Sequence, residues 1–254
     1  MADFSSAAIS KRATQGAFWS ARSSGIRPST AIVTEANTGI GFECGSQLLD
    51  LQLGRLVMAV WSLPKREEAK RQLLSSKSNA KCQIEVCRLD LASYDSITAF
   101  RSFALDPKTR HEESIQVNHP GNALSVILMI PFLQARSPVY PGCITFVSFD
   151  TPAWAEFKKE RSLCTSKSLG QLSLRELAKC VPSSVVVINA SNPGLCKSGL
   201  ERDFKGSVVG YAARFMQFLI ARDASVGVRA IVVAAVNHGP ASHKQYVEDS
   251  KVVP

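Results

Sequence analysis

The chain has 254 residues, of which 45% are hydrophobic and 20% are charged. A chain of this length can bury one sizeable core, and a single α/β domain of this size is ordinary. The longest apolar runs cover residues 124–133 and 230–236. Both are shorter than the ~20 residues that a membrane-spanning helix needs. We therefore expect a soluble protein with no integral membrane segment.

The 30 Lys and Arg residues outnumber the 21 Asp and Glu residues, which gives a formal net charge of +9. Such a surface can simply be solvated, or it can attract a ligand that carries phosphate groups. No run of Lys and Arg alternates with aromatic residues, so nucleic acid is not favoured as a partner. The seven cysteines form neither a CxxC pair nor a Cys/His metal spacing. This pattern predicts no metal site and is typical of a reducing compartment such as the cytoplasm.

Residues 1–29 are rich in Ser, Ala and Arg, and Asp3 is their only acidic residue. This composition is found in mitochondrial presequences, and it is also compatible with a poorly ordered arm that leads into the first strand. We favour the arm, because the deficit of acidic residues is modest over so short a segment. A single domain is then expected over residues 30–254.

A glycine-rich turn follows the first expected strand. The β-branched residues Ile32–Thr34 predict a buried strand, and an apolar helical pattern extends from Ile40 to Leu53. Between them, Gly39 and Gly41 let the backbone approach a pyrophosphate group, which then lies at the positive end of the helix. We call residues 35–41 the glycine turn, and we predict that it binds a nucleotide.

Strand-like and helix-like segments alternate along the rest of the chain. Strands are expected at Arg55–Val60, Gln83–Cys87, Cys143–Ser148 and Ser184–Asn189, and helices at 64–75, from about Ser93, at 115–135, 163–179 and 226–236. A polar tail from Asn237 closes the domain. This alternation predicts an α/β fold, namely a doubly wound, mostly parallel Rossmann-like sheet with helices on both faces.

The sequence resembles the short-chain dehydrogenase/reductase family, with the family's motifs in order. These are TEANTGIG at 34–41, LDL at 89–91, VNH at 117–119, ITFVS at 144–148, SK at 166–167 and NPG at 192–194. The resemblance covers about Thr30 to Val253, and the C-terminal HKQYVEDSKVVP is similar to fungal members that modify secondary metabolites. It implies an oxidoreductase that acts with a nicotinamide cofactor on a carbonyl or alcohol of a hydrophobic secondary metabolite.

The resemblance also implies roles for individual residues. Asn118 would hold a water molecule in a proton relay, Ser148 would contact the substrate carbonyl, and Lys167 would bond the nicotinamide ribose. Asp90 would meet the adenine edge, although it could also cap the helix that begins near Ser93. The implied cofactor-binding set is Asn37, Thr38, Gly39, Ile40, Gly41, Asp90, Asn118, Lys167, Pro193, Gly194, Leu195 and Ser198.

The end of the second strand bears on which nucleotide is preferred. NAD-binding sheets place an acid there to accept hydrogen bonds from the ribose hydroxyls, but here the strand ends in Trp61 and Ser62. Lys65 and Arg66 follow, and two cations could meet a 2′-phosphate. NADP(H) is therefore expected in preference to NAD. The same two cations could instead be solvated charges that open a helix.

Glu35 stands where the family has the first glycine of the turn. A residue with a Cβ in that conformation costs on the order of 1 kcal/mol or more. Its carboxylate, at about 5 Å from a pyrophosphate and an effective dielectric near 20, would repel it by roughly 3 kcal/mol. This corresponds to a loss of affinity of about a hundredfold unless the side chain turns outward.

The proton donor of the family is also replaced. The family's YxxxK pair places a tyrosine four residues before the lysine, on the same helix face, but that position is Leu163, which carries no proton. Phe149 stands where the second serine of the family would contact the substrate. The alternative function is therefore a catalytically impaired protein of this fold, such as a pseudoenzyme, an interaction partner or a catalyst of non-redox cyclisation.

The central fourth strand of the family has no counterpart in the sequence. Residues 102–114 contain a proline and five charged side chains after Leu105, without four consecutive apolar residues. Asp90 and Asn118 are 28 positions apart, and a crossover helix uses about a dozen of them. We expect this strand to be missing or rebuilt. The resemblance also implies a homodimer or homotetramer formed through the helices at 115–135 and 163–179.

Overall fold

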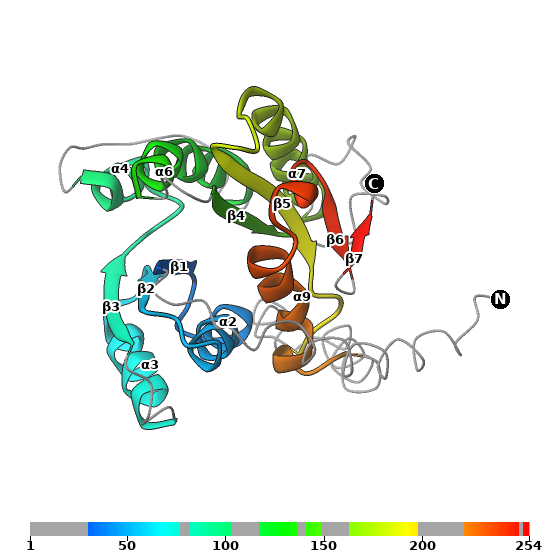
Figure 1. Cartoon of the computed structure of the whole chain (residues 1–254). Coiled ribbons are helices and arrows are strands. Elements are labelled where there is room, and N and C mark those ends of the chain that lie inside the picture. Colours follow the sequence, from blue (N-terminus) through cyan, green and yellow to red (C-terminus); the bar gives the residue numbers. More distant parts are fainter. Residues whose placement is uncertain are drawn as a thin grey trace, which may run out of the picture.

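The computed structural model describes residues 30–76, 82–102, 117–136, 141–148, 163–197, 221–248 and 251–253. The first part contains β1 (Thr30–Thr34), α2 (Gly39–Asp50), β2 (Arg55–Val60), α3 (Leu63–Ser76), β3 (Gln83–Arg88) and α4 (Tyr94–Ser102). The second contains η1 (Val117–Gly121), α6 (Asn122–Arg136), β4 (Gly142–Val147), α7 (Leu163–Cys180), β5 (Val186–Asn192), α9 (Ala224–Val236), η4 (Gly239–Ser242), β6 (Tyr246–Glu248) and β7 (Lys251–Val253). Figure 1 shows their arrangement.

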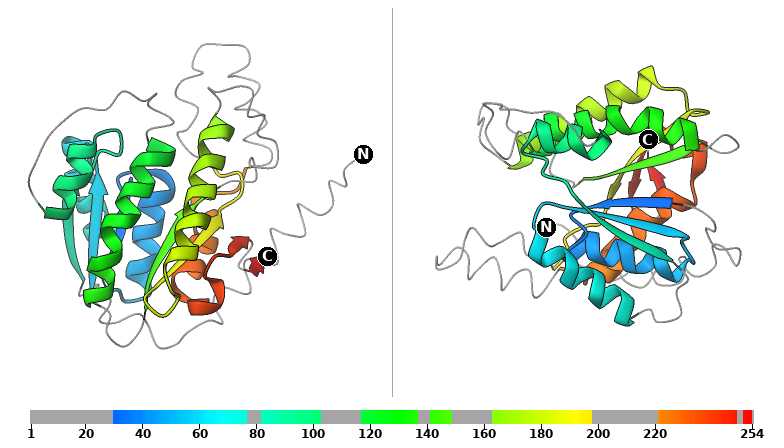
Figure 2. Two further views of the ribbon diagram at one scale, coloured as in Figure 1. Left: turned by 90° about the horizontal axis from the view of Figure 1, so that it is seen from above. Right: turned by 90° about the vertical axis from the view of Figure 1, so that its left-hand side faces the viewer.

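Helices cover both faces of the strands, so the expected α/β architecture is confirmed. Figure 2 shows α2, α3 and α9 on one side and α4, α6 and α7 on the other. Buried side chains of α2, β2, α3 and α9 form one core cluster, and those of α6, β4, α7 and β5 form another. The ends of β2 and β3 pack with α4 in a third cluster, next to α6.

The strands form two sheets in the described part of the chain. Strands β1, β2 and β3 are parallel neighbours, with Thr30 opposite Arg55 and Arg55 opposite Gln83. The second sheet has the order β4-β5-β6-β7, in which only the β6–β7 pair is antiparallel. No described strand lies between β1 and β4, and the expected loss of the fourth strand stays a prediction. Residues 103–116, where that strand would be sought, lie outside the described residues.

The outer strands β1 and β4 of the two described sheets are less buried than β5. Every residue of β1 is half-buried or exposed, and in β4 only Phe146 is buried. In β5, by contrast, six of the seven residues are buried. Strands at the middle of a doubly wound sheet are normally covered on both faces and paired on both edges. β1 and β4, the outer strands of the two described sheets, are therefore less covered than β5, which has a partner on each side.

The C-terminal tail is more regular than the sequence predicted. It forms the short strands β6 and β7, and β6 pairs with Ala190–Asn192. This pairing explains why β5 continues to Asn192, beyond the predicted end at Asn189. The start of β5 is also later than predicted, because the backbone turns at Pro182, whose carbonyl accepts hydrogen bonds from the N–H groups of Val185 and Val186.

His243 joins the tail to the two elements that it covers. Its Nδ1 accepts a hydrogen bond from the Ile188 N–H of β5 at 3.1 Å, and its Nε2 lies 3.0 Å from the Ala178 carbonyl of α7. Both contacts require the neutral ring with the proton on Nε2. Within the described residues, no helix is long and apolar enough to cross a membrane, and no group of three or more His, Cys, Asp or Glu side chains could hold a metal ion.

We expect His243→Phe to lower the free energy of unfolding by about 1–3 kcal/mol, because it leaves two backbone groups unbonded. Urea unfolding followed by circular dichroism measures the change. Lys251→Ala, an exposed change in the same tail, is the control and should stay close to wild type. Equal stability of the two variants would show that His243 does not hold the tail.

Candidate functional site

The glycine turn connects β1 to α2 with the backbone shape that the sequence predicted. Glu35 has φ of +53° and Gly39 has φ of +58°, so both residues are in the left-handed region. The Glu35 N–H donates to the Ala59 carbonyl at 2.8 Å, which extends the β1–β2 pairing by one residue. Glutamate therefore occupies a conformation that favours glycine, at a cost of roughly 1 kcal/mol or more.

Gly41 is the closest packing point of the turn. A Cβ at this position would lie 2.5 Å from the Glu35 carbonyl oxygen and 2.9 Å from that of Thr34. Both obstacles are backbone atoms, which cannot move aside as a flexible side chain can. The first turn of α2 therefore lies directly against the end of β1, and Thr38, the N-cap residue, makes no side-chain cap bond there. This is the arrangement that brings helix N–H groups to a bound phosphate.

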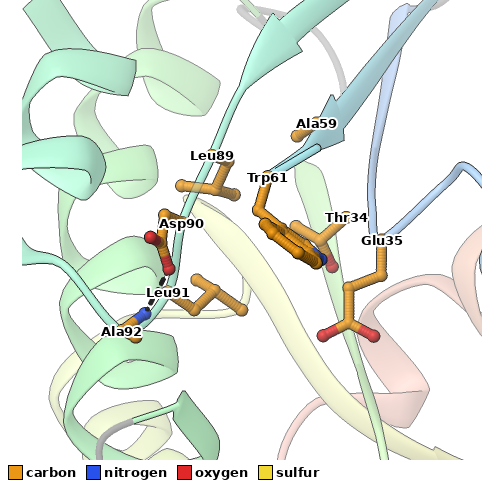
Figure 3. Close-up of a pocket in the computed structure, with 8 residues that line it drawn as sticks. All are labelled: Thr34, Glu35, Ala59, Trp61, Leu89, Asp90, Leu91 and Ala92. Atoms are coloured by element: carbon orange, nitrogen blue, oxygen red, sulfur yellow. Dashed lines mark hydrogen bonds between the residues drawn. The ribbon is translucent and has the colours of Figure 1, made fainter. Parts of the chain in front are cut away.

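A pocket of about 380 Å³ adjoins the turn (Figure 3). It lies beyond the carboxyl ends of β1, β2 and β3, where open α/β sheets bind their ligands. Its lining comprises Thr34, Glu35, Ala59, Trp61, Leu89, Asp90, Leu91 and Ala92. The lining thus contains two carboxylates and, among the residues that the structure describes, no cation. Lys65 is exposed on α3, and the side chain of Arg66 lies outside the described residues.

Asp90 organises the loop between β3 and α4. One oxygen of its carboxylate accepts a hydrogen bond from the Ala92 N–H at 3.0 Å, and its own N–H donates to the Ser96 hydroxyl at 2.8 Å. The helix itself is capped by Ser93, whose hydroxyl accepts from the Ser96 N–H at 3.2 Å. The expected capping by Asp90 is therefore wrong, because a serine stands at the residue directly before the helix. Contact of Asp90 with adenine stays a prediction.

One face of α7 brings three predicted catalytic residues together. Gly170 and Gln171 follow Lys167 by three and four positions, so all three share this face. A Cβ on Gly170 would lie 2.3 Å from the Asn118 carbonyl oxygen, so α7 and η1 touch through their backbones. The Gln171 side-chain amide donates to the Ser148 hydroxyl at the end of β4. The structure therefore groups Asn118, Ser148 and Lys167 around α7.

Two members of this group differ from expectation in their surroundings. Asn118 is buried in η1, a π-helical turn that contains Pro120, so the predicted long helix begins irregularly rather than as an α-helix. Proline has no N–H for the helical ladder, and π-helical turns occur frequently at functional sites. Ser148 is fully buried, and its hydroxyl already accepts from Gln171. A substrate carbonyl would have to compete for this hydroxyl.

Glu35 acts on the charge of Lys167 across the site. Burial lowers the pKa of the Lys167 ammonium below its ordinary value of 10.5, and the negative charge of Glu35 opposes this shift. The carboxylate in the glycine turn is thus close enough to act on the lysine of α7. It places a negative charge in a region where the family resemblance implies a negatively charged cofactor.

The turn after β5 is held from two sides. The Asn192 side chain accepts a hydrogen bond from the Gly194 N–H at 2.8 Å, and Gly194 has φ of +70°. Pro193 is fully buried, and a Cβ on Gly227 of α9 would lie 2.7 Å from its carbonyl oxygen. Leu195 is 51% exposed, so its apolar side chain is accessible to a ligand. Asn192 is the last residue of β5, so the turn begins at Pro193.

Some predicted positions fall outside the described residues. These are Ser198, Phe149 and the side chain of Leu163, although the backbone of α7 begins at Leu163. Sequence reasoning also missed Gly170, Gln171 and Gly227. In the sequence they are only two glycines and one glutamine within helices. Their importance comes from contacts with segments that are distant in the sequence.

We expect Gly41→Ala to destabilise the fold by about 1–3 kcal/mol, since the added methyl group overpacks against backbone. Gly45→Ala on the same helix is the matched control, because its methyl group would meet only the ends of two side chains, those of Leu56 at 3.2 Å and Leu73 at 3.8 Å. That variant should be neutral, or more stable by up to about 1 kcal/mol through helix propensity. Chemical unfolding of both variants makes the comparison, and equal stabilities would contradict the close packing at Gly41.

The lowered pKa of Lys167 predicts a pH dependence. Between the folded-state pKa and 10.5, the unfolded chain binds a proton that the folded chain does not, so stability rises with pH. The destabilisation caused by burying the charged Lys167 side chain is complete below this pH window and absent above pH 10.5. Unfolding free energies measured against pH should therefore rise more steeply for wild type than for Lys167→Met. Lys179→Met, an exposed change on the same helix, is the control; parallel curves for wild type and Lys167→Met would refute the burial of the charge.

Fungal proteins of known class are similar to this chain over most of its length. A short-chain dehydrogenase of Aspergillus ruber is 36% identical over 270 residues, covering 89% of this chain and 77% of the relative. A short chain dehydrogenase/reductase of Annulohypoxylon moriforme is 31% identical over 269 residues, covering 88% and 76%. No family model matches the chain. Both alignments are longer than the chain itself, so the relatives hold residues that it lacks.

Solved structures share the fold. L-sorbose reductase from Gluconobacter frateurii, complexed with NADPH and L-sorbose, has a TM-score of 0.70 at 14% identity and covers 88% of this chain and 95% of its own. An NADPH-bound short chain oxidoreductase of Pseudomonas aeruginosa with an atypical catalytic center has a TM-score of 0.70 at 15% identity and covers 88% and 96%. These likenesses establish the Rossmann-like architecture, and the fungal relatives establish the family. The chain belongs to the short-chain dehydrogenase/reductase family of oxidoreductases.

Proposed function

We propose that this protein binds NADP(H), in preference to NAD, and catalyses reduction or oxidation of a carbonyl or alcohol group on a fungal secondary metabolite. The observation that carries the proposal is Gly41, which holds the start of α2 against the carbonyl of Glu35 beside a pocket at the strand ends. A side chain at this glycine would fill the space through which the turn approaches a pyrophosphate. The chain keeps the one residue that permits this approach.

The described residues fit a nicotinamide nucleotide in most respects. The glycine turn, with Asn37, Thr38, Gly39, Ile40 and Gly41, would hold the pyrophosphate, and Asp90 would lie beside the adenine ring. The turn at Pro193, Gly194 and Leu195 would cover the nicotinamide, together with Ser198. When bound, the cofactor would supply or accept the hydride. The preference for NADP(H) is supported by the absence of an acid at Trp61 and by the NADPH present in the two solved structures named above.

The residues around α7 would position substrate and protons. Lys167 would bond the nicotinamide ribose, and its lowered pKa favours exchange of its proton more than that of an exposed lysine. The carbonyl of Asn118 is held against Gly170, where it would orient a water molecule next to the lysine. Ser148 would contact the substrate carbonyl after exchanging its bond to Gln171. Tyrosine, the usual proton donor in the family, is replaced by Leu163.

Leu163 supports a second candidate function. With leucine at this position and Glu35 in the glycine turn, the chain can retain the fold and pocket without hydride transfer. It would then be a pseudoenzyme, an interaction partner or a catalyst of a non-redox cyclisation. Both candidates take a small hydrophobic metabolite as ligand. In either case we propose a cytoplasmic protein, arranged as a homodimer or homotetramer through α6 and α7.

Titration with NADPH, followed by calorimetry, tests the proposed function. We expect Glu35→Gly to bind NADPH on the order of a hundredfold more tightly than wild type, since it removes the repelling charge. Glu35→Gln also removes the charge, so it should recover most of this gain. Failure of all three proteins to bind NADPH at millimolar concentration would eliminate the redox function.

A second test restores the missing proton donor. We expect Leu163→Tyr to raise the rate of NADPH oxidation by about a hundredfold or more with an aromatic ketone or quinone as acceptor, in the range of a general acid. Leu163→Phe, which adds the ring without the hydroxyl, is the matched control. Equal rates for the two variants at saturating NADPH would favour the non-redox candidate.

A further inference from the structure

An unusually exposed indole stands at the entrance to the nucleotide pocket. Trp61 follows directly after β2, and 63% of its surface is exposed, more than for any other large hydrophobic side chain in the described part of the chain. An exposed indole of this size retains a large apolar surface that a ligand can cover. Its place among the residues that line the pocket makes that ligand the occupant of the pocket.

The surroundings of Trp61 favour a flat ring. Figure 3 shows its side chain extending into the space between the Leu89–Leu91 segment and Glu35. The two leucines are buried and form an apolar wall in the loop after β3. Ala59 and Ala92 add only methyl groups to the lining. The volume of about 380 Å³ is at the small end of the roughly 300–1,000 Å³ typical of ligand pockets.

The charges of the pocket select which part of a nucleotide enters it. Glu35 and Asp90 contribute carboxylates, and the lining in the described residues holds no Lys or Arg. A phosphate group would be repelled within this lining, so the 2′-phosphate of NADP(H) would lie outside it, toward the exposed Lys65 of α3. A neutral base would not be repelled. A base that carries an amino group can also donate a hydrogen bond to a carboxylate. Adenine combines both properties, and the adjoining glycine turn then meets the phosphates.

We propose that Trp61 stacks on the adenine ring of the bound nucleotide and supplies most of the affinity at this end of the site. The inference rests on the proposed binding of a nicotinamide nucleotide. It assigns the position after β2 to recognition of the base by an aromatic face, in place of recognition of the ribose or its phosphate by a charged side chain. Stacking of this kind accepts any planar base, so the choice of adenine falls to Asp90.

Calorimetric titration of the full chain tests the inference with two ligands, NADPH and reduced nicotinamide mononucleotide, which lacks the adenosine half. We expect Trp61→Leu to weaken NADPH binding by about tenfold to a hundredfold, and Trp61→Phe by less than about fivefold. Neither change should alter the affinity for the mononucleotide. Leu172→Gln, at a leucine of α7 that is 51% exposed, is the control and should bind both ligands as wild type does.

Two outcomes separate the inference from the function on which it rests. If wild type binds NADPH and Trp61→Leu binds it equally well, the role of Trp61 is refuted while the proposed function stands. If wild type binds neither ligand, the proposed function fails and the stacking role fails with it. A chain with Trp19 and Trp154 replaced by phenylalanine adds a direct readout, since NADPH should quench the remaining Trp61 fluorescence. An unchanged emission in the presence of bound NADPH would refute stacking.

Discussion

The contact between Gly41 and the carbonyl of Glu35 is the constraint on which the site depends. It lets the N-terminus of α2 lie against the end of β1, and this position fixes the glycine turn beside the ends of β2 and β3. A larger residue at Gly41 would push the helix away from the strand and widen the turn. The same geometry places Glu35 at the border of the pocket, so one backbone contact determines both the shape and the charge of the nucleotide site.

Glu35 links the two halves of the site electrostatically. Its left-handed backbone is strained, and its carboxylate disfavours a second anion nearby, yet it supports the buried ammonium of Lys167. In a family member with glycine at this position, the cofactor or water would have to stabilise the lysine ammonium instead. The acid therefore acts in two opposite ways: it is a counter-charge for Lys167, and under the proposed function it would weaken the binding of a nucleotide. This balance is compatible with weak nucleotide binding and with a non-redox role.

The sequence predicted those features that depend on neighbouring residues. The strand Arg55–Val60 was predicted to the residue, and the conformation at Glu35 followed from its place in the motif. Features that depend on distant contacts were missed. The tail gives no local signal that β6 will pair with Ala190–Asn192. Likewise, no residue near Gly170 in the sequence indicates that η1 packs against α7 at this glycine. Capping by Asp90 was wrong because Ser93 competes for the same helix end, which spacing alone does not reveal.

The central claim is that the glycine turn still receives the phosphates of a nucleotide. Amide hydrogen exchange, resolved to residues 36–42 and measured with and without saturating NADPH, tests it most directly. The account predicts slower exchange of the backbone N–H groups at the start of α2, because they would donate to the pyrophosphate. Unchanged exchange there, in a protein that NADPH protects elsewhere, would show that the nucleotide binds at another place.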